Sequence, residues 1–266
     1  MKYRYAVLSY IVGKGYEKEH PILVKDEECD YVMVVDDPEY KSDTYRVVYD
    51  PELSGTPFNK VLQIRYNPFK YTDAPIVIKI DGSMQVVGDL KPLVDKFEKD
   101  NYDISICMHP TRVNLYDEMV AWVQQRNVPV EEANKCLAFL AQFEGYDVKN
   151  HKGLYQLNYS IQRNDRVNND INRMTYAFCK YLSPNKTNLD TDVMRVDQIV
   201  FSAVLNKYFN NIKVMAFDER INHSKFFCWY AHNSDIPYSF GGVETLCKPY
   251  LFNKPLHNQL RPDVDF

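Results

Sequence analysis

The sequence contains few of the residues that interrupt or cross-link a protein chain. Of its 266 residues, only 9 are Gly and 14 are Pro, and no low-complexity run is present. Such a chain is not expected to be disordered. Its six Cys are widely scattered and form no C-x-x-C pair, which argues against a zinc site and against a disulfide framework. We therefore expect reduced thiols in a cytoplasmic protein.

Long apolar runs are also missing. Stretches such as residues 31–35 are far shorter than the roughly 20 residues of a membrane-spanning helix. The first residues run directly into a strand-like pattern, without the apolar region and the small-residue cleavage site of a signal peptide. These absences predict a cytoplasmic chain with no transmembrane segment. Peripheral contact with the inner face of the membrane stays open, although no basic amphipathic helix marks a surface for it.

Positive charge is not in excess, because 36 Asp and Glu outnumber 32 Lys and Arg and give a formal net charge of −4. A general nucleic-acid binder needs a basic face, so nucleic acid is not an expected partner. Hydrophobic residues make up 45% of the chain, which is enough to bury one large core. Tyr is abundant, with 21 residues. Most are expected to pack, but a flat ring with a polar tip also suits contacts with sugars and bases.

Strand and helix patterns alternate over the first hundred residues. Short β-branched runs predict strands, and apolar residues at helical spacing predict helices between them. The predicted strands cover residues 4–10, 30–35, 45–49, 75–80 and 102–107, and the predicted helices cover residues 58–69 and 89–100. This alternation predicts an α/β fold with a mixed, mostly parallel central sheet and helices on both faces.

The second half of the chain is richer in helices. We predict helices at residues 116–125, 130–143, 168–181 and 197–208, and strands at residues 153–161 and 212–217. No internal repeat and no linker-like run divides the chain. We therefore predict a single domain over residues 1–236, followed by a Pro-containing wrapping tail over residues 237–266.

Acidic residues follow two of the predicted strands, at Asp36-Asp37 and at Asp81-Gly82-Ser83. Ligands of open α/β sheets bind beyond the carboxyl ends of the strands. A buried strand would present Asp81 at its tip, and Mg²⁺ or Mn²⁺ commonly bridges such a carboxylate to substrate phosphates. The alternative for the same residues is an ordinary turn, since D-G is a common turn dipeptide.

Further polar residues occupy positions from which they could serve the same site. Lys60 and Arg65 lie on one predicted helix and could steady a diphosphate, although solvated helix charges explain them equally well. Asp197 opens a predicted helix, where the dipole would keep it ionised for a general base, or where it acts as a plain cap. His223 follows the last predicted strand and is a competent metal ligand, although a lone His is more often structural.

The loop after the strand at residues 102–107 is polar and aromatic. It contains His109 and Arg112 and continues into Tyr116 and Glu118. Side chains of these types directly after a strand are typical of a sugar-binding loop.

These motifs occur in a set order: S-Y-I-V-G-K-G-Y, D-Y-V-M-V-V-D-D, N-K-V-L-Q-I-R-Y-N-P-F-K-Y, I-K-I-D-G-S, M-H-P-T-R with Y-D-E, R-V-D-Q and N-H-S. From about residue 5 to about residue 223, the chain resembles the GT-A glycosyltransferases. More narrowly, it resembles a glycosyltransferase-like family first catalogued as a domain of unknown function. Plant members of that family are linked to wall and mucilage polysaccharide, and bacterial members to surface polysaccharides.

The resemblance implies a GT-A-like, Rossmann-like domain with glycosyltransferase activity, a hexosyltransferase in particular. It implies a nucleotide-sugar donor such as a UDP-sugar, and a glycan or lipid-linked glycan acceptor in bacterial capsule, lipopolysaccharide or other surface polysaccharide synthesis. The donor half would cover about residues 1–107 and the acceptor half about residues 108–236. The implied donor-binding residues are Ser9, Tyr10, Asp36, Lys60, Arg65, Asp81, Gly82 and Ser83, and the implied acceptor-binding residues are His109, Arg112, Tyr116 and Gln198.

The same resemblance implies a divalent cation, Mn²⁺ or Mg²⁺, on Asp81 and His223. Ser83 replaces the second carboxylate of the D-x-D pattern, which implies a weakly held metal. Asp197 would be the base that deprotonates the acceptor hydroxyl if the reaction inverts the sugar, and would orient hydroxyl groups if it retains the configuration.

Two other functions stay open. A sugar nucleotidyltransferase shares the architecture and the acidic metal residues, but it usually begins with a Gly-rich phosphate loop, and residues 13–15 are too sparse for one. A non-catalytic carbohydrate-binding protein on the same fold would tolerate the loss of Asp81 and Asp197.

Overall fold

The computed structural model describes most of the first 218 residues and a few short segments beyond them. The described residues are 2–13, 18–109, 112, 114–126, 129–142, 146, 153–182, 196–218, 221, 224–230 and 235. The predicted wrapping tail at residues 237–266 lies outside them. No helix in this part of the chain is long and apolar enough to cross a membrane.

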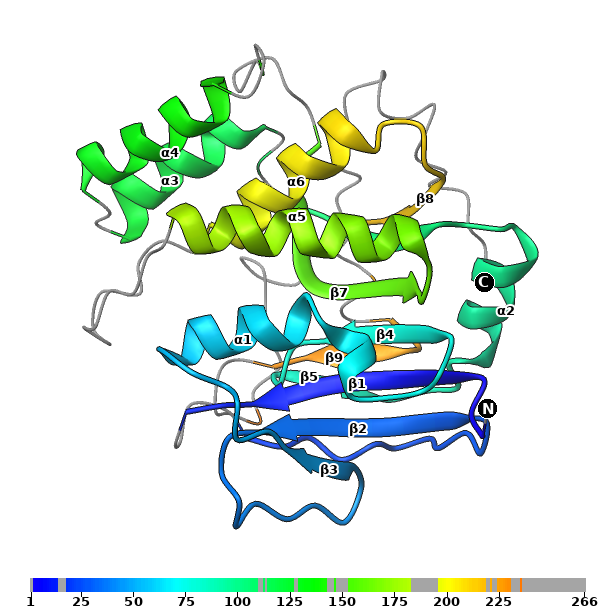
Figure 1. The fold of residues 1–266 in the computed structure, drawn as a ribbon. Helices are drawn as coiled ribbons and strands as arrows, with labels where there is room; N and C mark the ends of the chain where they lie inside the picture. The colour runs from blue at the N-terminus through cyan, green and yellow to red at the C-terminus, as the bar shows by residue number, and fades with distance from the viewer. Residues whose placement is uncertain are drawn as a thin grey trace.

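A seven-stranded sheet in the order β3-β2-β1-β4-β7-β6-β8 forms the centre of the fold (Figure 1). Its strands are β1 (Tyr5–Ile11), β2 (Cys29–Val35), β3 (Arg46–Tyr49), β4 (Ile76–Ile80), β6 (Ile104–Met108), β7 (Tyr155–Arg163) and β8 (Val214–Phe217). Strand β7 runs antiparallel to its neighbours β4 and β6, and all other pairs are parallel. The predicted mixed, mostly parallel α/β sheet is confirmed.

A second, two-stranded sheet was not predicted. It pairs β5 (Met84–Val86) with β9 (Phe227–Trp229) in antiparallel orientation. Strands of three residues carry too little alternation for a sequence pattern, and their partners come from distant parts of the chain. The small sheet matters for function because it begins directly after the Asp81-Gly82-Ser83 segment.

Helices follow the predicted positions closely. They are α1 (Pro57–Arg65), α2 (Lys91–Lys99), α3 (Leu115–Arg126), α4 (Val130–Gln142), α5 (Arg166–Leu182) and α6 (Asp197–Tyr208), with the 3-10 helix η1 (Pro68–Lys70). The helix predicted at residues 58–69 is shorter than expected. It ends at Arg65 because Pro68 has no N–H for a helical hydrogen bond and restricts the residue before it, so η1 starts there instead.

The two faces of the sheet bury separate clusters of apolar side chains. On β1, Tyr5 and Val7 pack into the cluster that contains Phe97 of α2, whereas Ala6 and Leu8 pack with α1 on the opposite face. Helices α1, α5 and α6 lie on one side of the sheet (Figure 1). Helices therefore cover both faces, as the alternation of residue types predicts.

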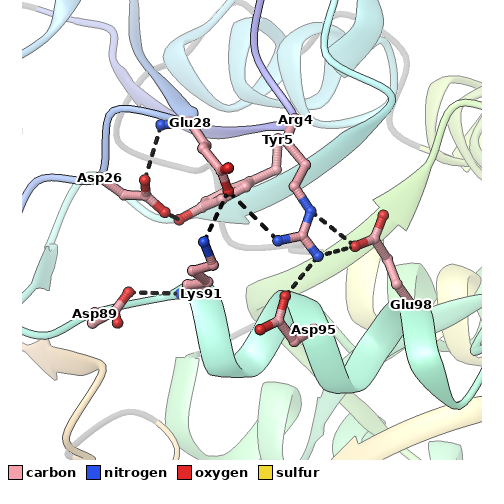
Figure 2. Close-up of polar contacts among 8 residues, drawn as sticks. All are labelled: Arg4, Tyr5, Asp26, Glu28, Asp89, Lys91, Asp95 and Glu98. Atoms are coloured by element: carbon pink, nitrogen blue, oxygen red, sulfur yellow. Dashed lines mark hydrogen bonds and ion pairs between the residues drawn. The ribbon is translucent and has the colours of Figure 1, made fainter.

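A network of charged side chains ties the start of β1 to α2 (Figure 2). Arg4 pairs with Glu98, with Asp95 at 2.6 Å and with Glu28 at 3.6 Å. Lys91 at the start of α2 also pairs with Glu28, at 3.4 Å. These residues lie at the amino end of β1, so the network fixes the edge of the sheet opposite to the ends of β1 and β4 that carry the candidate site.

Candidate functional site

The candidate site lies where the direction of strand addition reverses. From β1 the chain adds β2 and β3 on one side of the sheet, and then crosses through α1 to place β4 on the other side. In open α/β sheets such a switch point, at the carboxyl ends of the strands, is where ligands bind. Tyr10 lies near the end of β1, and Asp81 directly follows β4.

Four side chains meet at this point, and we call them the Arg65 cluster: Tyr10, Arg65, Asp81 and Asp197. The hydroxyl of Tyr10 donates to Oδ1 of Asp81. Arg65 donates through Nη2 to Oδ1 of Asp81 at 2.6 Å and to the Tyr10 hydroxyl at 2.5 Å, and through Nη1 to Oδ2 of Asp197. Residues from β1, α1, the end of β4 and the start of α6 are thereby joined.

Electrostatics keep Arg65 charged although its side chain is only 9% exposed. Burial by itself lowers the pKa of Arg65, but the neighbouring Tyr10, Asp81 and Asp197 raise it well above its ordinary value. Burial also raises the pKa of Tyr10, with Asp81 acting in the same direction, so this phenol stays neutral. The two carboxylates of the cluster therefore outnumber its one fixed cation, so a further positive charge bound here would be stabilised.

The carboxyl group of Asp197 is buried at the start of α6, with 5% of its side chain exposed. The predicted position at a helix N-terminus is confirmed. Its Oδ2 is taken by Arg65. Asp81 is more accessible, with 28% of its side chain exposed. The two carboxylates thus share one cation but differ in their access to solvent.

Lys79 lies two residues before Asp81 and was not among the predicted site residues. Its side chain is buried, and its Nζ donates to the backbone carbonyl of Arg65 at 3.0 Å. Burial, together with the charge of Arg65, lowers the pKa of Lys79 well below its ordinary value. The only sequence signal for it is a charged residue inside the apolar run I-V-I-K-I.

Beside the cluster, Asp36 and Lys60 form a second ion pair. Nζ of Lys60 lies 2.7 Å from Oδ2 of Asp36, and the backbone N–H of Gly13 donates to the same carboxylate at 3.2 Å. Gly13 has a φ of +82°, and a Cβ there would lie 3.0 Å from Cγ of Pro57, so only glycine fits this position. The ion pair thereby joins α1 to the residue that follows β2.

The Asp81-Gly82-Ser83 segment forms a turn, in which the N–H of Met84 donates to the Asp81 carbonyl at 2.9 Å. Ser83 is 1% exposed, and its Oγ accepts a hydrogen bond from Nε1 of Trp229 at 3.1 Å. Ser83 therefore anchors strand β9. Ser9 is likewise buried, within β1.

The described residues supply few ligands for a metal ion. Among them, no group of three or more His, Cys, Asp or Glu lies close enough to hold one. Asp81 already uses Oδ1 for Arg65 and Tyr10, and His223 lies outside the described residues. Mg²⁺ is often bound through one or two carboxylates together with substrate phosphates. The residues fit a divalent cation in that way, with the free oxygen of Asp81 as a ligand.

A third group of polar side chains follows β6. The ring nitrogen Nδ1 of His109 accepts from the backbone N–H of Arg112 at 3.1 Å, and the Arg112 guanidinium pairs with the fully buried Glu118. Gln198 donates to Oε1 of Glu118 at 3.4 Å. Because Gln198 directly follows Asp197, this group is connected to the Arg65 cluster. Tyr116, on the first turn of α3, has 38% of its surface exposed.

The structure brings most of the predicted donor-side residues together around the ends of β1, β2 and β4. It also shows that Arg65 and Lys60 are already paired with carboxylates. Glu118 belongs to the predicted sugar-binding stretch, but its role in joining Arg112 to Gln198 of α6 is not visible in local sequence. Residues 14–17 and 190–195, which flank predicted site residues, lie outside the described residues.

Comparison with known proteins gives little further information. No protein-family model matches the chain, and no curated protein matches it. Among solved structures, the apo form of mouse xyloside xylosyltransferase 1 is similar, with a TM-score of 0.43 and 8% sequence identity. The match covers 80% of this chain and 85% of that chain. A likeness at this level assigns neither an activity nor site residues.

Proposed function

We propose that this protein is a glycosyltransferase that moves a sugar from a nucleotide-diphosphate donor to a hydroxyl group of a glycan. The observation that carries the proposal is the Arg65 cluster. It places two carboxylates, Asp81 and Asp197, at the switch point of an open α/β sheet, where ligands of such folds bind. The ordered motifs from residue 5 to residue 223, which resemble those of GT-A glycosyltransferases, support the same activity.

The donor would lie across the ends of β1, β2 and β4. Asp36 and Lys60 are suited to the nucleoside and the diphosphate because they lie beside the switch point with part of each side chain exposed. A UDP-sugar is the donor that the resemblance favours. Binding would require Lys60 to exchange its contact with Asp36 for one with a phosphate oxygen.

Asp197 is the proposed base if the reaction inverts the anomeric centre. The acceptor oxygen attacks the anomeric carbon, the bond from that carbon to the diphosphate breaks, and the diphosphate leaves with the electron pair. The acceptor proton passes to Asp197, whose Oδ2 is held by Arg65 and whose Oδ1 is the oxygen that would take the proton. Arg65 is then a positioning residue that holds this carboxylate in place.

A divalent cation, Mn²⁺ or Mg²⁺, is part of the proposal. Its ligands would be the free oxygen of Asp81, His223 and the donor phosphates. When bound, it would neutralise charge on the leaving diphosphate. Asp81 itself is kept in position by Tyr10 and Arg65, which occupy its other oxygen.

The proposed acceptor side comprises His109, Arg112, Tyr116 and Gln198. Glu118 connects this side to the start of α6, because it contacts both Arg112 and Gln198. The connection supports the assignment, since it places the acceptor residues next to the proposed base Asp197. A glycan or lipid-linked glycan in surface polysaccharide synthesis, handled in the cytoplasm, is the acceptor that the resemblance favours.

The test is an assay for nucleoside diphosphate release from a panel of nucleotide sugars with Mn²⁺, with and without acceptor glycans. We expect release with at least one donor, and a loss of about a hundredfold or more in turnover for Asp197→Asn, as for removal of a general base. Asp95→Asn, a carboxylate change at the opposite edge of the sheet, is the matched control and should keep full activity. Donor binding without release in any combination would instead indicate a non-catalytic carbohydrate-binding protein.

A further inference from the structure

A groove of about 630 Å³ lies on the face of the sheet that α1 and α5 cover, outside the Arg65 cluster. Its walls are the end of α1 with η1, the turn after β3, and the first turns of α5, helices that lie on the same side of the sheet in Figure 1. We call it the α1–α5 groove. Its volume lies within the range of about 300–1,000 Å³ that is usual for small-molecule sites.

The groove is separate from the candidate active site. Asn164, on its wall, follows the end of β7, and its N–H donates to the carbonyl of Pro75 at 2.8 Å. Pro75 directly precedes β4, whereas Asp81 follows it. The Asn164 wall therefore lies at the amino end of β4, away from Asp81. The four residues of the Arg65 cluster are not part of the lining, so a ligand in the groove would not occupy their site.

Side-chain amides line much of the groove. Asn67, Asn164 and Asn169 are exposed there, and Nδ2 of Asn169 donates to Oδ1 of Asn164 at 3.4 Å. Each amide has further donor or acceptor capacity for a ligand. Gln63 is held in place, since its Nε2 donates to the carbonyls of Ser54 at 2.8 Å and Asn59 at 3.1 Å. A lining of this kind matches a ligand that has many hydroxyl groups.

Aromatic rings form the rest of the surface. Tyr66 and Tyr71 are buried at its base, and Phe69 and Tyr176 are half-buried. Oη of Tyr71 donates to Asp50 at 2.8 Å, so this ring is fixed in place. Rigid rings with polar neighbours bind ligands that present both C–H faces and hydroxyl groups.

The charges in the groove do not favour an anion. Lys70 is paired with Asp50 at 2.8 Å and with Glu52 at 2.6 Å, and Arg173 is paired with Asp170 at 2.8 Å. Two carboxylates, Asp50 and Glu52, line the groove together with these two cations, so its lining carries no net charge. An uncharged ligand therefore fits the groove better than a phosphate or a nucleotide.

We propose that the α1–α5 groove is a binding site for an uncharged oligosaccharide. The inference goes beyond the proposed function and does not depend on it, because a groove that binds a glycan would do so whether or not the protein transfers sugars. Side-chain amides, aromatic rings and a lining without net charge, together in one concave surface, are the features that carry it.

The test measures binding of cellohexaose, maltohexaose and xylohexaose to the full chain without a nucleotide sugar. Calorimetry gives the affinity, and NMR follows the side-chain amide signals of Asn67 and Asn169. We expect at least one hexasaccharide to shift these signals, and Tyr176→Ala and Asn169→Ala each to weaken its binding by about tenfold. Tyr181→Ala, on the same helix but outside the groove, is the matched control and should leave the affinity unchanged.

Three results would overturn the inference. They are no binding of any of the three hexasaccharides, binding that both groove variants leave intact, and shifts of the same amide signals by inorganic pyrophosphate in place of the sugars. Asp197→Asn separates this inference from the proposed function. It should abolish donor turnover while keeping hexasaccharide binding in the groove, so that failure of either idea is visible without the other.

Discussion

Arg65 on α1 and Asp197 on α6 form a buried ion pair across 132 residues of sequence. The same guanidinium also binds Asp81, so a single side chain holds both carboxylates of the candidate site. Removing one partner of a buried ion pair leaves an uncompensated buried charge. This lowers the stability of the fold much more than the loss of an exposed ion pair does. The cluster therefore links the stability of the fold to the geometry of the site.

Replacing Arg65 by Met should lower the free energy of unfolding by about 3–5 kcal/mol, because both carboxylates lose their cation. Adding Asp197→Asn to Arg65→Met should restore part of that loss, since one of the orphaned charges is then gone. Urea unfolding followed by circular dichroism gives both values.

Arg163→Met is the matched control for this change. Arg163 donates to the backbone carbonyls of Tyr102 at 2.9 Å and Phe97 at 3.2 Å, so its loss orphans no carboxylate. We expect a loss of about 1–3 kcal/mol there. The loss of unfolding free energy in the double variant could equal the sum of the losses for Arg65→Met and Asp197→Asn alone. The ion pair would then not be the source of the effect.

Replacing Lys79 by Met should stabilise the protein at neutral pH. Burial, with Arg65 nearby, lowers the pKa of Lys79 in the folded state, so the unfolded chain binds a proton that the folded chain does not. This difference in proton binding lowers the stability of the wild-type fold by about 1.4 kcal/mol for each pH unit between the ordinary Lys pKa of about 10.4 and the lowered pKa of the folded state. The stability of the wild-type fold therefore rises with pH over that interval, and the penalty from Lys79 is absent above the ordinary Lys pKa.

The measurement for Lys79 is urea unfolding of wild type and Lys79→Met across neutral and alkaline pH. The variant should be more stable near neutral pH, and the gap should close as the pH rises. Lys99→Met, an exposed change on α2, should show no gap that depends on pH. A gap of constant size for Lys79→Met would mean that proton binding is not its cause.

Replacing Ser83 by Asp would recreate a D-x-D sequence, but we expect no gain in Mn²⁺ affinity. Ser83 is 1% exposed and bonded to Trp229, so the new carboxylate would be buried at the base of β9 instead of facing the donor. The thermal midpoint of Ser83→Asp should fall further than that of Ser83→Ala, which loses one hydrogen bond worth about 0.5–1.5 kcal/mol. Calorimetric Mn²⁺ titration with UDP present, beside thermal unfolding, checks both points. Tighter Mn²⁺ binding at an unchanged midpoint would contradict the buried position of Ser83.

Replacing Lys60 by Met should raise the KM for the nucleotide-sugar donor by about tenfold and leave kcat nearly unchanged. Lys60 pairs with Asp36 beside the switch point, where it is proposed to bind the donor equally in the ground and transition states. Initial rates with varied donor concentration measure both constants, with Lys99→Met as the lysine control. A fall in kcat at constant KM would assign Lys60 to the transition state instead.

Much of the architecture could be read from local patterns. The strands predicted at residues 30–35 and 75–80 are confirmed as β2 and β4, because continuous β-branched runs of this length form buried parallel strands. The helix predicted at residues 58–69 was too long, since the effect of Pro68 reaches back to its preceding residues. Strands β5 and β9 were missed, because pairing between short, distant segments leaves almost no periodic signal.

The sequence by itself determined which residues end up at the carboxyl edge of the sheet. Asp36 and Asp81 follow buried strands, and Asp197 starts a helix, because strand and helix boundaries depend on neighbouring residues. Only the tertiary structure decided what these carboxylates contact. Arg65 reaches Asp81 and Asp197 because strand order and helix packing bring α1, β4 and α6 together, and side-chain electrostatics at close range depend on that packing and not on sequence spacing.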